Sequence, residues 1–440
     1  LAKKAKEAAR PLALLSTHMK NKALCAMADR LLEEQEAILA ANQQDVDTVG
    51  INMKREEIKK AITRVQMTAE TIQKMADGLR RIAQLPDPVG DVTHMWVRPN
   101  GMQVSRMRVP IGVIGIVSDM GPLVLTEMAG LCVKAGNAVL IRGGPEWIQS
   151  APLVAAIMRE EGEKVGLPAS AIGYVERGEK DAALEILRQV GYVDAVIPCG
   201  GLGLRKTVVE QSRIPVLCQD FGISHVYVDA EADLPLAQNI VINSKVQEPS
   251  SANSVDTLLV HHSISRPLLS ALLLRLLEEF RVDVLGCVKT VALARIEPIS
   301  GHKGVLEAKE EDWKTQFLSP TLAVKIIMNV DEAINHIMAQ GVCHTAAIVT
   351  KDYANAMRFT REVDASAVLV NASTRFNDGV ELGFGGHLGV DTGRVHSKGP
   401  IGLEQLTCLK VVVLGTNHLR HPHPTPVPYE DAIMLRRPLS

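Results

Sequence analysis

The run Val109-Pro-Ile-Gly-Val-Ile-Gly-Ile-Val117 decides the fold class of this chain. It is short, continuous and rich in β-branched residues, which is typical of a strand buried on both faces of a sheet. A segment with helical spacing of apolar residues, Leu125–Lys134, follows it, and then a second apolar run, Ala138-Val-Leu-Ile-Arg142. This order of strand, helix and strand predicts a parallel sheet covered by helices.

The same alternation extends along the rest of the chain. Residues 1–85 are predicted to be helical, and Asp91–Arg108 alternates in strand fashion around Pro99-Asn-Gly101, which predicts a hairpin. Asn377–Gly402 is rich in glycine and is expected to be a loop. The other predicted elements are helices over Gln149–Val165, Asp181–Val190, Leu234–Lys245, Pro267–Phe280 and Tyr353–Glu362, and strands over Ile172–Val175, Val193–Ile197, Thr257–His261, Leu322–Ile327, Ala346–Thr350, Ser366–Asn371 and Leu406–Leu414.

Length and charge restrict the class of protein. A chain of 440 residues exceeds what one hydrophobic core serves, so two or more domains are expected. The formal net charge of −2 gives no reason to expect nucleic acid or an anionic membrane surface as a partner. No apolar run approaches the roughly 18–20 residues that span a bilayer, and Leu1–Lys6 lacks the apolar core of a signal peptide.

Cysteine and histidine positions predict no metal site. The seven cysteines are scattered and odd in number, without ligand-like spacing, so we expect neither a zinc site nor a disulfide framework. That usage fits a reducing, cytoplasmic setting. His421 and His423 lie in a proline-rich tail without an acidic or thiol partner, which favours a surface segment over a metal site.

Two glycine turns follow predicted strands. Arg142-Gly-Gly144 ends one strand, and Gly200-Gly-Leu-Gly203 comes after another. Either turn alone is typical of an ordinary tight turn after a strand. Together they favour a phosphate-bearing cofactor, because backbone N–H groups at such turns and at the following helix N-terminus attract negative charge. The candidate cofactor-binding residues are Arg142, Gly143, Gly144, Gly200 and Gly201.

Four segments, in order, resemble the gamma-glutamyl phosphate reductases of the aldehyde dehydrogenase superfamily. They are Arg108–Gly115, Gly136–Gly144, Val370–Phe376 and His396–Glu404, within a resemblance that runs from about residue 5 to about residue 415. The turn Ser250-Ser-Ala-Asn253 resembles the family's nucleophile loop. The resemblance implies an aldehyde dehydrogenase-like α/β fold, with a Rossmann-like cofactor domain, an α/β catalytic domain and an oligomerisation strand pair.

The resemblance also implies domain limits and partners. The NADP-binding domain would cover 1–90 and 109–229, the catalytic domain 230–386, and the oligomerisation strands 91–108 and 405–415, before a Pro/His-rich tail at 416–440. A homodimer or homotetramer is implied, with glutamate 5-kinase as a further candidate partner.

The implied reaction is the NADPH-dependent reduction of L-glutamate 5-phosphate to L-glutamate 5-semialdehyde in proline biosynthesis. A cysteine thiolate attacks the acyl phosphate, phosphate leaves, and hydride from NADPH releases the aldehyde. A hydrogen-bond donor must also stabilise the oxyanion.

Several positions depart from the family pattern. Ala252 stands where the family has its catalytic cysteine, next to Asn253, and Leu123 stands where an asparagine is the expected oxyanion donor. Family arginines are replaced by Gly121, Cys199 and Glu248, and a family glutamate is replaced by His387. Cys218 is a candidate for a migrated nucleophile, and Ser250 and Ser251 are weaker candidates because a serine needs an adjacent base.

Two functional hypotheses therefore stay open. The first is the reductase that the family resemblance implies. The second is a catalytically silent paralogue that acts as an assembly or regulatory partner of a proline-pathway enzyme. A third, more distant hypothesis is chemistry on another substrate through Cys218. The sequence leaves open whether the cofactor still binds.

Overall fold

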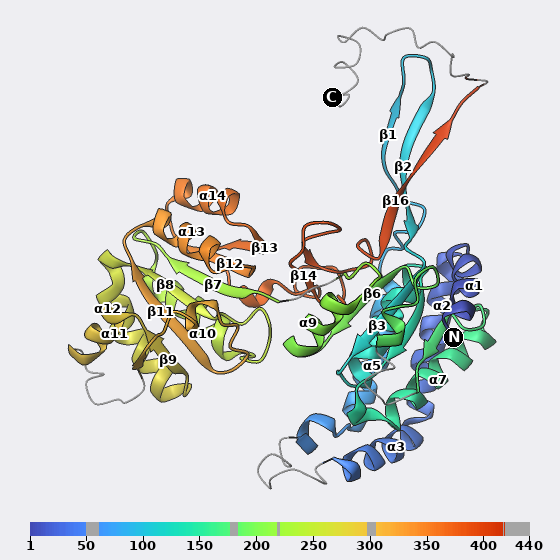
Figure 1. Cartoon of the computed structure of the whole chain (residues 1–440), viewed down its shortest axis with the longest axis horizontal. Helices are drawn as coiled ribbons and strands as arrows, with labels where there is room; N and C mark the ends of the chain where they lie inside the picture. Colours follow the sequence, from blue (N-terminus) through green and yellow to red (C-terminus); the bar gives the residue numbers. More distant parts are fainter. Residues whose placement is uncertain (50–60, 177–183, 218–220, 297–304, 417, 419–440) are drawn as a thin grey trace.

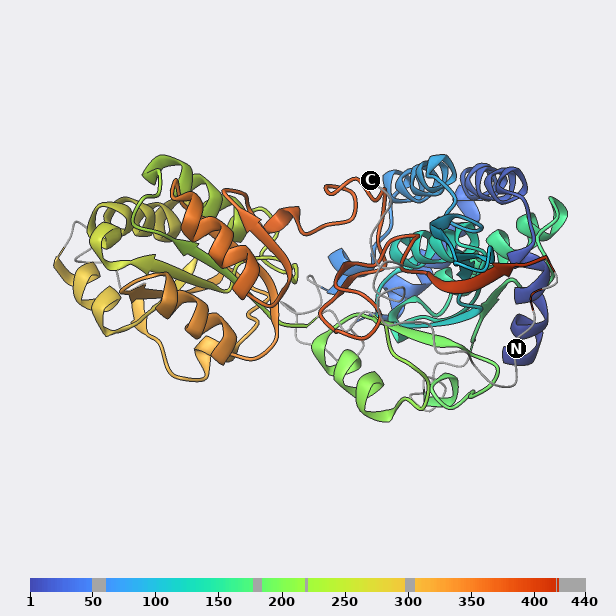
Figure 2. The ribbon, with the colours of Figure 1, turned by 90° about the horizontal axis from the view of Figure 1, so that it is seen from above.

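The computed structural model describes residues 1–49, 61–176, 184–217, 221–296, 305–416 and 418. Two parallel sheets, each packed against helices, lie at opposite ends of an elongated molecule, and a three-stranded arm projects beside one of them (Figures 1 and 2). The α/β class predicted from the sequence is confirmed.

The first sheet has four parallel strands in the order β5-β4-β3-β6. Strand β3, one of its two inner strands, is buried along its whole length, as the β-branched run predicts. The strands are β3 (Val113–Ser118), β4 (Ala138–Arg142), β5 (Ile172–Tyr174) and β6 (Ala195–Cys199). The helices of this half are α1 (Ala2–Ala13), α2 (Thr17–Glu33), α3 (Gln35–Thr48), α5 (Ala69–Gln84), α6 (Pro122–Lys134), α7 (Ser150–Lys164) and α9 (Leu202–Gln211).

The second sheet has seven parallel strands in the order β10-β9-β11-β8-β7-β12-β13. They are β7 (Ile223–Val228), β8 (Thr257–His261), β9 (Asp283–Gly286), β10 (Val305–Glu307), β11 (Thr321–Ile327), β12 (Cys343–Val349) and β13 (Ala365–Val370). The helices are α10 (Leu234–Val246), α11 (Ser265–Leu274), α12 (Val288–Ile296), α13 (Val330–Ala339) and α14 (Tyr353–Glu362).

The arm is antiparallel. It consists of β1 (Val92–Val97), β2 (Gln103–Pro110) and β16 (Thr407–Leu414), with β2 in the middle. The hairpin predicted around Pro99-Asn-Gly101 is therefore present, and the last strand joins it from the other end of the chain. Two short strands, β14 (Val390–Asp391) and β15 (Gly399–Pro400), pair within the segment expected to be a loop.

The run Val109–Val117 is two strands rather than one. Val109 and Pro110 end β2 in the arm, whereas Val113 begins β3 in the parallel sheet. The chain turns at Gly112, where φ is +133° and an added Cβ would lie 2.2 Å from a carboxylate oxygen of Asp194. Only glycine accepts both conditions, so the expectation of a single strand was wrong.

The second sheet begins before residue 230, the expected start of the second domain. Strand β7 lies between β8 and β12 in that sheet, although its residues fall within the range 109–229. The sequence analysis also missed α9, α12, α13, β9 and β10. Of the predicted helix Asp181–Val190, residues 181–183 lie outside the described residues.

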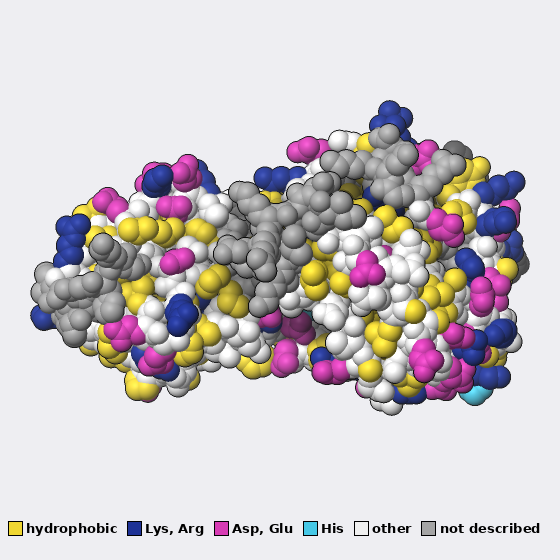
Figure 3. Space-filling view, turned by 90° about the horizontal axis from the view of Figure 1, so that it is seen from below, with side chains coloured by type: hydrophobic (Ala, Val, Ile, Leu, Met, Phe, Trp, Pro, Cys, Tyr) yellow, Lys and Arg dark blue, Asp and Glu magenta, His cyan; other side chains and the backbone are white. Residues whose placement is uncertain are grey.

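The surface carries both signs of charge. Seen from below, acidic and basic side chains are interspersed with apolar ones (Figure 3). No helix in the described ranges is long and apolar enough to cross a bilayer.

Two buried histidines lie close together, one on a strand of the second sheet and one on a helix beside it. His225 of β7 is fully buried and His336 of α13 is 6% exposed, with their rings 6.1 Å apart. Neither Nε2 has a hydrogen-bond partner. Burial lowers the pKa of His225 to about 3 and that of His336 to about 4. Both imidazoles are therefore neutral in the folded protein at neutral pH.

These histidines predict a loss of stability in mild acid. An unfolded histidine binds a proton near pH 6.5, whereas the folded chain resists protonation down to about pH 4 at His336. Stability is then lost as the pH falls through this window, by about 1 kcal/mol for each imidazole between about pH 7 and about pH 5.5.

The measurement is urea unfolding at both pH values for the native chain and His336→Gln. Burial raises the pKa of Asp256 to about 6, which works in the opposite direction, so the comparison with the variant isolates the histidine. Equal pH dependence in the two proteins would contradict the prediction.

Candidate functional site

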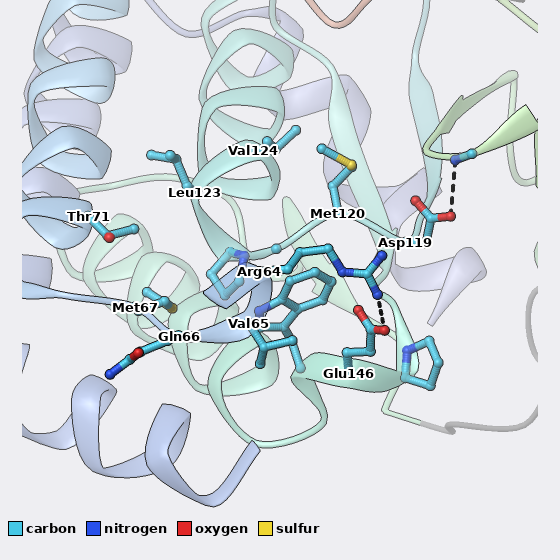
Figure 4. A pocket seen from close by; sticks show the side chains of 15 residues that line it. Arg64, Val65, Gln66, Met67, Thr71, Asp119, Met120, Leu123, Val124 and Glu146 are labelled. Carbon is cyan, nitrogen blue, oxygen red and sulfur yellow. Dashed lines mark hydrogen bonds and ion pairs between the residues drawn. The ribbon is translucent and has the colours of Figure 1, made fainter. Parts of the chain in front are cut away.

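A cavity of about 600 Å³ lies at the carboxyl ends of strands β3, β4 and β6. This edge is where open parallel sheets bind ligands. Figure 4 shows the lining side chains, which come from the segments after β3 and β4 and from residues 64–71. The lining residues are Arg64, Val65, Gln66, Met67, Thr71, Asp119, Met120, Gly121, Pro122, Leu123, Val124, Pro145, Glu146, Trp147 and Gly201.

The cavity wall is mostly apolar, with one ion pair. Leu123, in the first turn of α6, is half-buried and presents a side chain without polar atoms. Arg64 pairs with Glu146, and 63% of the arginine side chain is exposed, so the pair lies on the solvent side of the cavity. The position where an oxyanion donor was expected is therefore in the cavity, but its side chain cannot donate a hydrogen bond.

Gly121 and Trp147 fill one space together. Trp147 is 4% exposed, and a Cβ added at Gly121 would meet carbons of its indole ring at 3.0 Å. Gly121 has φ −77°, so its backbone would accept other residues. The indole, rather than the backbone, is what would crowd a side chain at 121.

Asp119, which follows β3, contacts the turn between β6 and α9. Its carboxylate accepts the N–H of Gly201 at 3.1 Å (Figure 4). A Cβ added at Gly200 would lie 1.8 Å from its Oδ1. Its Cα also lies 3.0 Å from the Cβ position of Gly144. One carboxylate thus contacts the turn at the N-terminus of α9, where negative charge is favoured.

The other glycine turn is fixed by the chain's own packing. A Cβ added at Gly143 would lie 2.3 Å from the hydroxyl of Tyr174. Arg142 ends β4, is 7% exposed, and its Nε has no hydrogen-bond partner. The glycines at 143 and 200 are therefore required by neighbouring side chains, with or without a ligand.

Ala252 and Asn253 form a turn between α10 and β8, an inner strand of the second sheet. The carbonyl of Ala252 accepts the hydroxyl of Ser224 at 3.0 Å, and its methyl group is half-buried. The N–H of Val255 donates to the carbonyl of Ser244 at 3.0 Å. The turn is therefore attached to both α10 and β7.

Asn253 joins this turn to the segment after β13. Its amide group donates to the carbonyls of Asn377 at 3.1 Å and Arg375 at 3.4 Å. Its Oδ1 accepts from Ser251 at 2.9 Å and from the guanidinium of Arg375. The side chain is 5% exposed and holds the turn in place through these contacts.

Two buried ionisable side chains, Asp256 and Lys245, hold the backbone on either side of the turn. Asp256 accepts N–H groups of Ser224 and Phe317, both at 2.9 Å, and burial raises its pKa to about 6. Lys245 donates to the carbonyl of Ser319 at 3.1 Å, and burial lowers its pKa to about 8. Each group is fully or almost fully buried, so these contacts stabilise the backbone rather than offer a reactive side chain.

The structure brings some predicted residues together and leaves others apart. Leu123 and Gly201 line the same cavity. The described hydrogen bonds of the Ala252–Asn253 turn go to the second half of the molecule. Cys218 lies outside the described residues, so its proposed role stays a prediction.

Sequence reasoning missed Asp119, Trp147 and Arg375 as site residues. Asp119 directly follows the buried strand β3, and acidic residues at that edge are a signal that could have been weighed. No comparable signal marks Trp147, because its importance depends on the absence of a side chain at Gly121.

Comparison with known proteins gives a consistent picture. The model of the aldehyde dehydrogenase family matches residues 1–284 and 305–412. The gamma-glutamyl phosphate reductase of Thermodesulfovibrio yellowstonii is 44% identical over 420 residues, which cover 95% of this chain and 97% of that protein.

Solved structures agree. The crystal structure of gamma-glutamyl phosphate reductase from Thermotoga maritima has a TM-score of 0.90 and 38% identity, and the match covers 96% of this chain and 99% of that one. An engineered glycolyl-CoA reductase with bound NADP⁺ matches at a TM-score of 0.65 and 15% identity, covering 94% of this chain and 96% of that one, which shows the shared fold alone.

The Gly121–Trp147 contact predicts a local incompatibility. Gly121→Ala should lower the free energy of unfolding by about 1–3 kcal/mol, because the new Cβ overpacks the indole. The cost should shrink in a Trp147→Leu background, and urea unfolding of the four proteins gives the coupling.

Gly203→Ala is the matched control. Gly203 lies in α9 with nothing within 4 Å of its Cβ position, so this change should not destabilise the chain. An equal cost of Gly121→Ala in both backgrounds would show that the indole is not responsible.

Proposed function

Because this chain belongs to the aldehyde dehydrogenase family, and within it to the gamma-glutamyl phosphate reductases, we propose that it acts in the NADPH-dependent reduction of L-glutamate 5-phosphate to L-glutamate 5-semialdehyde, a step of proline biosynthesis. The observation that carries the proposal is 44% identity over 95% of the chain. In the reaction the acyl carbon gains a hydride, the phosphate leaves with the electrons of the C–O bond, and NADP⁺ is the other product.

One turn after the first sheet offers backbone N–H groups to a phosphate-bearing cofactor. The turn at Gly200 and Gly201 opens α9 at the carboxyl end of β6, and Gly201 lines the large cavity. Backbone N–H groups there would hold phosphate oxygens. When bound, NADPH supplies the hydride. The chain's part is to orient the acyl group, exclude water and hold the leaving phosphate.

Asp119 opposes that binding, because its carboxylate already accepts the N–H of Gly201 at 3.1 Å. Asp119→Asn should therefore bind NADPH about tenfold more tightly, since a neutral amide does not repel phosphate. Titration of nicotinamide fluorescence measures the affinity.

Asp91→Asn, at a separate cavity, is the control and should leave the affinity unchanged. Equal affinities of Asp119→Asn and the native chain would mean that no phosphate approaches the Gly200–Gly201 turn.

A second candidate function is a catalytically silent paralogue that assists a proline-pathway enzyme. The side chains at Ala252 and Leu123, where the family resemblance expects the thiol and the oxyanion donor, end in methyl groups. A methyl group can neither attack a carbonyl nor donate a hydrogen bond. This observation favours loss of turnover with retention of the fold.

The arm favours assembly into a homodimer or homotetramer. Its edge strands β1 and β16 carry exposed apolar side chains, and no other described strand pairs with their outer edges. An edge of this kind can pair with a second copy. Glutamate 5-kinase is a further proposed partner, and the cytoplasm the proposed location. The exposed apolar residues are Val92, Met95, Val97, Leu409, Val411, Val413 and Leu414.

Restoring side chains at the two changed positions tests the proposed reaction. Ala252→Cys supplies a thiol, and the double variant Ala252→Cys/Leu123→Asn should turn over about 10²–10³-fold faster than Ala252→Cys alone, because it adds an oxyanion donor. The assay follows NADP⁺ reduction with L-glutamate 5-semialdehyde and phosphate.

Ala252→Ser/Leu123→Asn controls for the thiol, and Cys218→Ser tests the migrated nucleophile. Turnover by the native chain that Cys218→Ser abolishes would exclude the silent paralogue. Turnover by no variant, including the double one, would contradict the proposed reaction.

A further inference from the structure

A second cavity, of about 230 Å³, lies beside the turn that contains Ala252. Two of its residues end α10 and four follow strand β13. No role was predicted for this group of side chains. The lining residues are Asn243, Gln247, Arg375, Phe376, Asp378 and Glu381.

Arg375 provides the positive charge of this cavity. Its Nε donates to Oε1 of Gln247 at 2.9 Å, and a terminal nitrogen donates to Oδ1 of Asn253. Both acceptors are neutral amides. Within the part of the chain that the structure describes, no carboxylate lies at ion-pair distance from this guanidinium. The charge is therefore fixed in position without a direct counter-ion.

Two carboxylates line the same cavity. Oδ1 of Asp378 accepts the N–H groups of Val380 at 2.8 Å and Glu381 at 3.2 Å, which orients its carboxylate. Burial lowers the pKa of Arg375, whereas Glu248, Asp378 and Glu381 raise it, so all three carboxylates act on the guanidinium through space.

We propose that this cavity binds the α-amino-acid end of a ligand. Arg375 would hold the α-carboxylate, Asp378 and Glu381 would hold the α-ammonium group, and the 45%-exposed Phe376 would cover the adjoining methylene groups. Three carboxylates near one guanidinium disfavour a phosphate dianion here, so the phosphate end of a substrate must lie elsewhere.

The identity of the amino acid as a glutamate derivative rests on the proposed function. The charge pattern of the cavity does not rest on the proposed function. The hydrogen bond from Arg375 to Asn253 joins this cavity to the neighbouring turn, so an amino acid bound here would lie beside the turn that contains Ala252. The assignment makes Arg375, Asp378 and Glu381 specificity-determining residues for the amino-acid end.

Titration calorimetry of the full chain with three probes tests the proposal. L-glutamate carries both groups, glutarate lacks the ammonium group, and 4-aminobutyrate lacks the α-carboxylate. We expect L-glutamate to bind at least about tenfold more tightly than either, because each analogue leaves one set of charges unpaired. Comparable affinities for the three probes, or binding of none of them, would overturn the proposal.

A variant pair locates the site. Glu381→Gln removes one exposed carboxylate and should weaken L-glutamate binding about fivefold, whereas it should not weaken the binding of glutarate, which has no ammonium group to lose a partner. Glu310→Gln, also exposed but outside this cavity, should change neither. Glu381 is chosen rather than Arg375, because Arg375 also donates hydrogen bonds to Gln247 and to Asn253 in the turn that contains Ala252. Unchanged L-glutamate affinity in Glu381→Gln would overturn the assignment.

This experiment is independent of the reduction. Binding is measured without NADPH and needs no thiol at position 252, so L-glutamate can bind in a chain that fails to reduce the acyl phosphate. A chain that reduces the acyl phosphate but binds L-glutamate no better than glutarate would contradict only the inference about this cavity.

Discussion

The contact between Asp194 and the backbone at Gly112 fixes where the arm ends and the first sheet begins. The Asp194 carboxylate accepts the N–H of Val113 at 2.8 Å and an ammonium hydrogen of Lys6 at 2.6 Å. It also fills the space that a side chain at 112 would need. Strand β3 therefore has a defined start, in register with β4 and β6 on either side. The cavity residues that follow β3, from Asp119 to Leu123, are therefore positioned by the contact of Asp194 at the start of the strand.

The parts of the fold that depend on local pattern could be predicted. Strands Ala138–Arg142 and Thr257–His261 and helix Tyr353–Glu362 have the predicted limits, because their apolar spacing is strong and turn residues flank them. Strand β7 was missed because Ser224 and His225 interrupt its apolar character. Both are fully buried, and Ser224 is satisfied by Asp256, a partner 32 residues away that no local pattern reveals.

Some features of the candidate site could likewise be predicted from the sequence, and others could not. The glycine turns could be placed at the carboxyl edge of a parallel sheet from strand order, whereas Leu123 was singled out only by the family resemblance. The carboxylate of Asp119 against Gly200, the indole against Gly121 and the guanidinium between Gln247 and Asn253 are contacts through space. Their geometry depends on how separate segments pack, so the residue types alone could not predict them.

The fit of Trp147 against Gly121 also restricts how this site can change over generations. An arginine at 121, which the family resemblance expects, would force the indole to move, because the indole lies 3.0 Å from the position of its Cβ. Removing the indole first opens a cavity in a nearly fully buried place, at a cost of about 3–5 kcal/mol. Because the two positions are in contact, the cost of a change at one depends on the residue at the other. A return of the arginine at 121 would therefore be expected to require a smaller residue at 147.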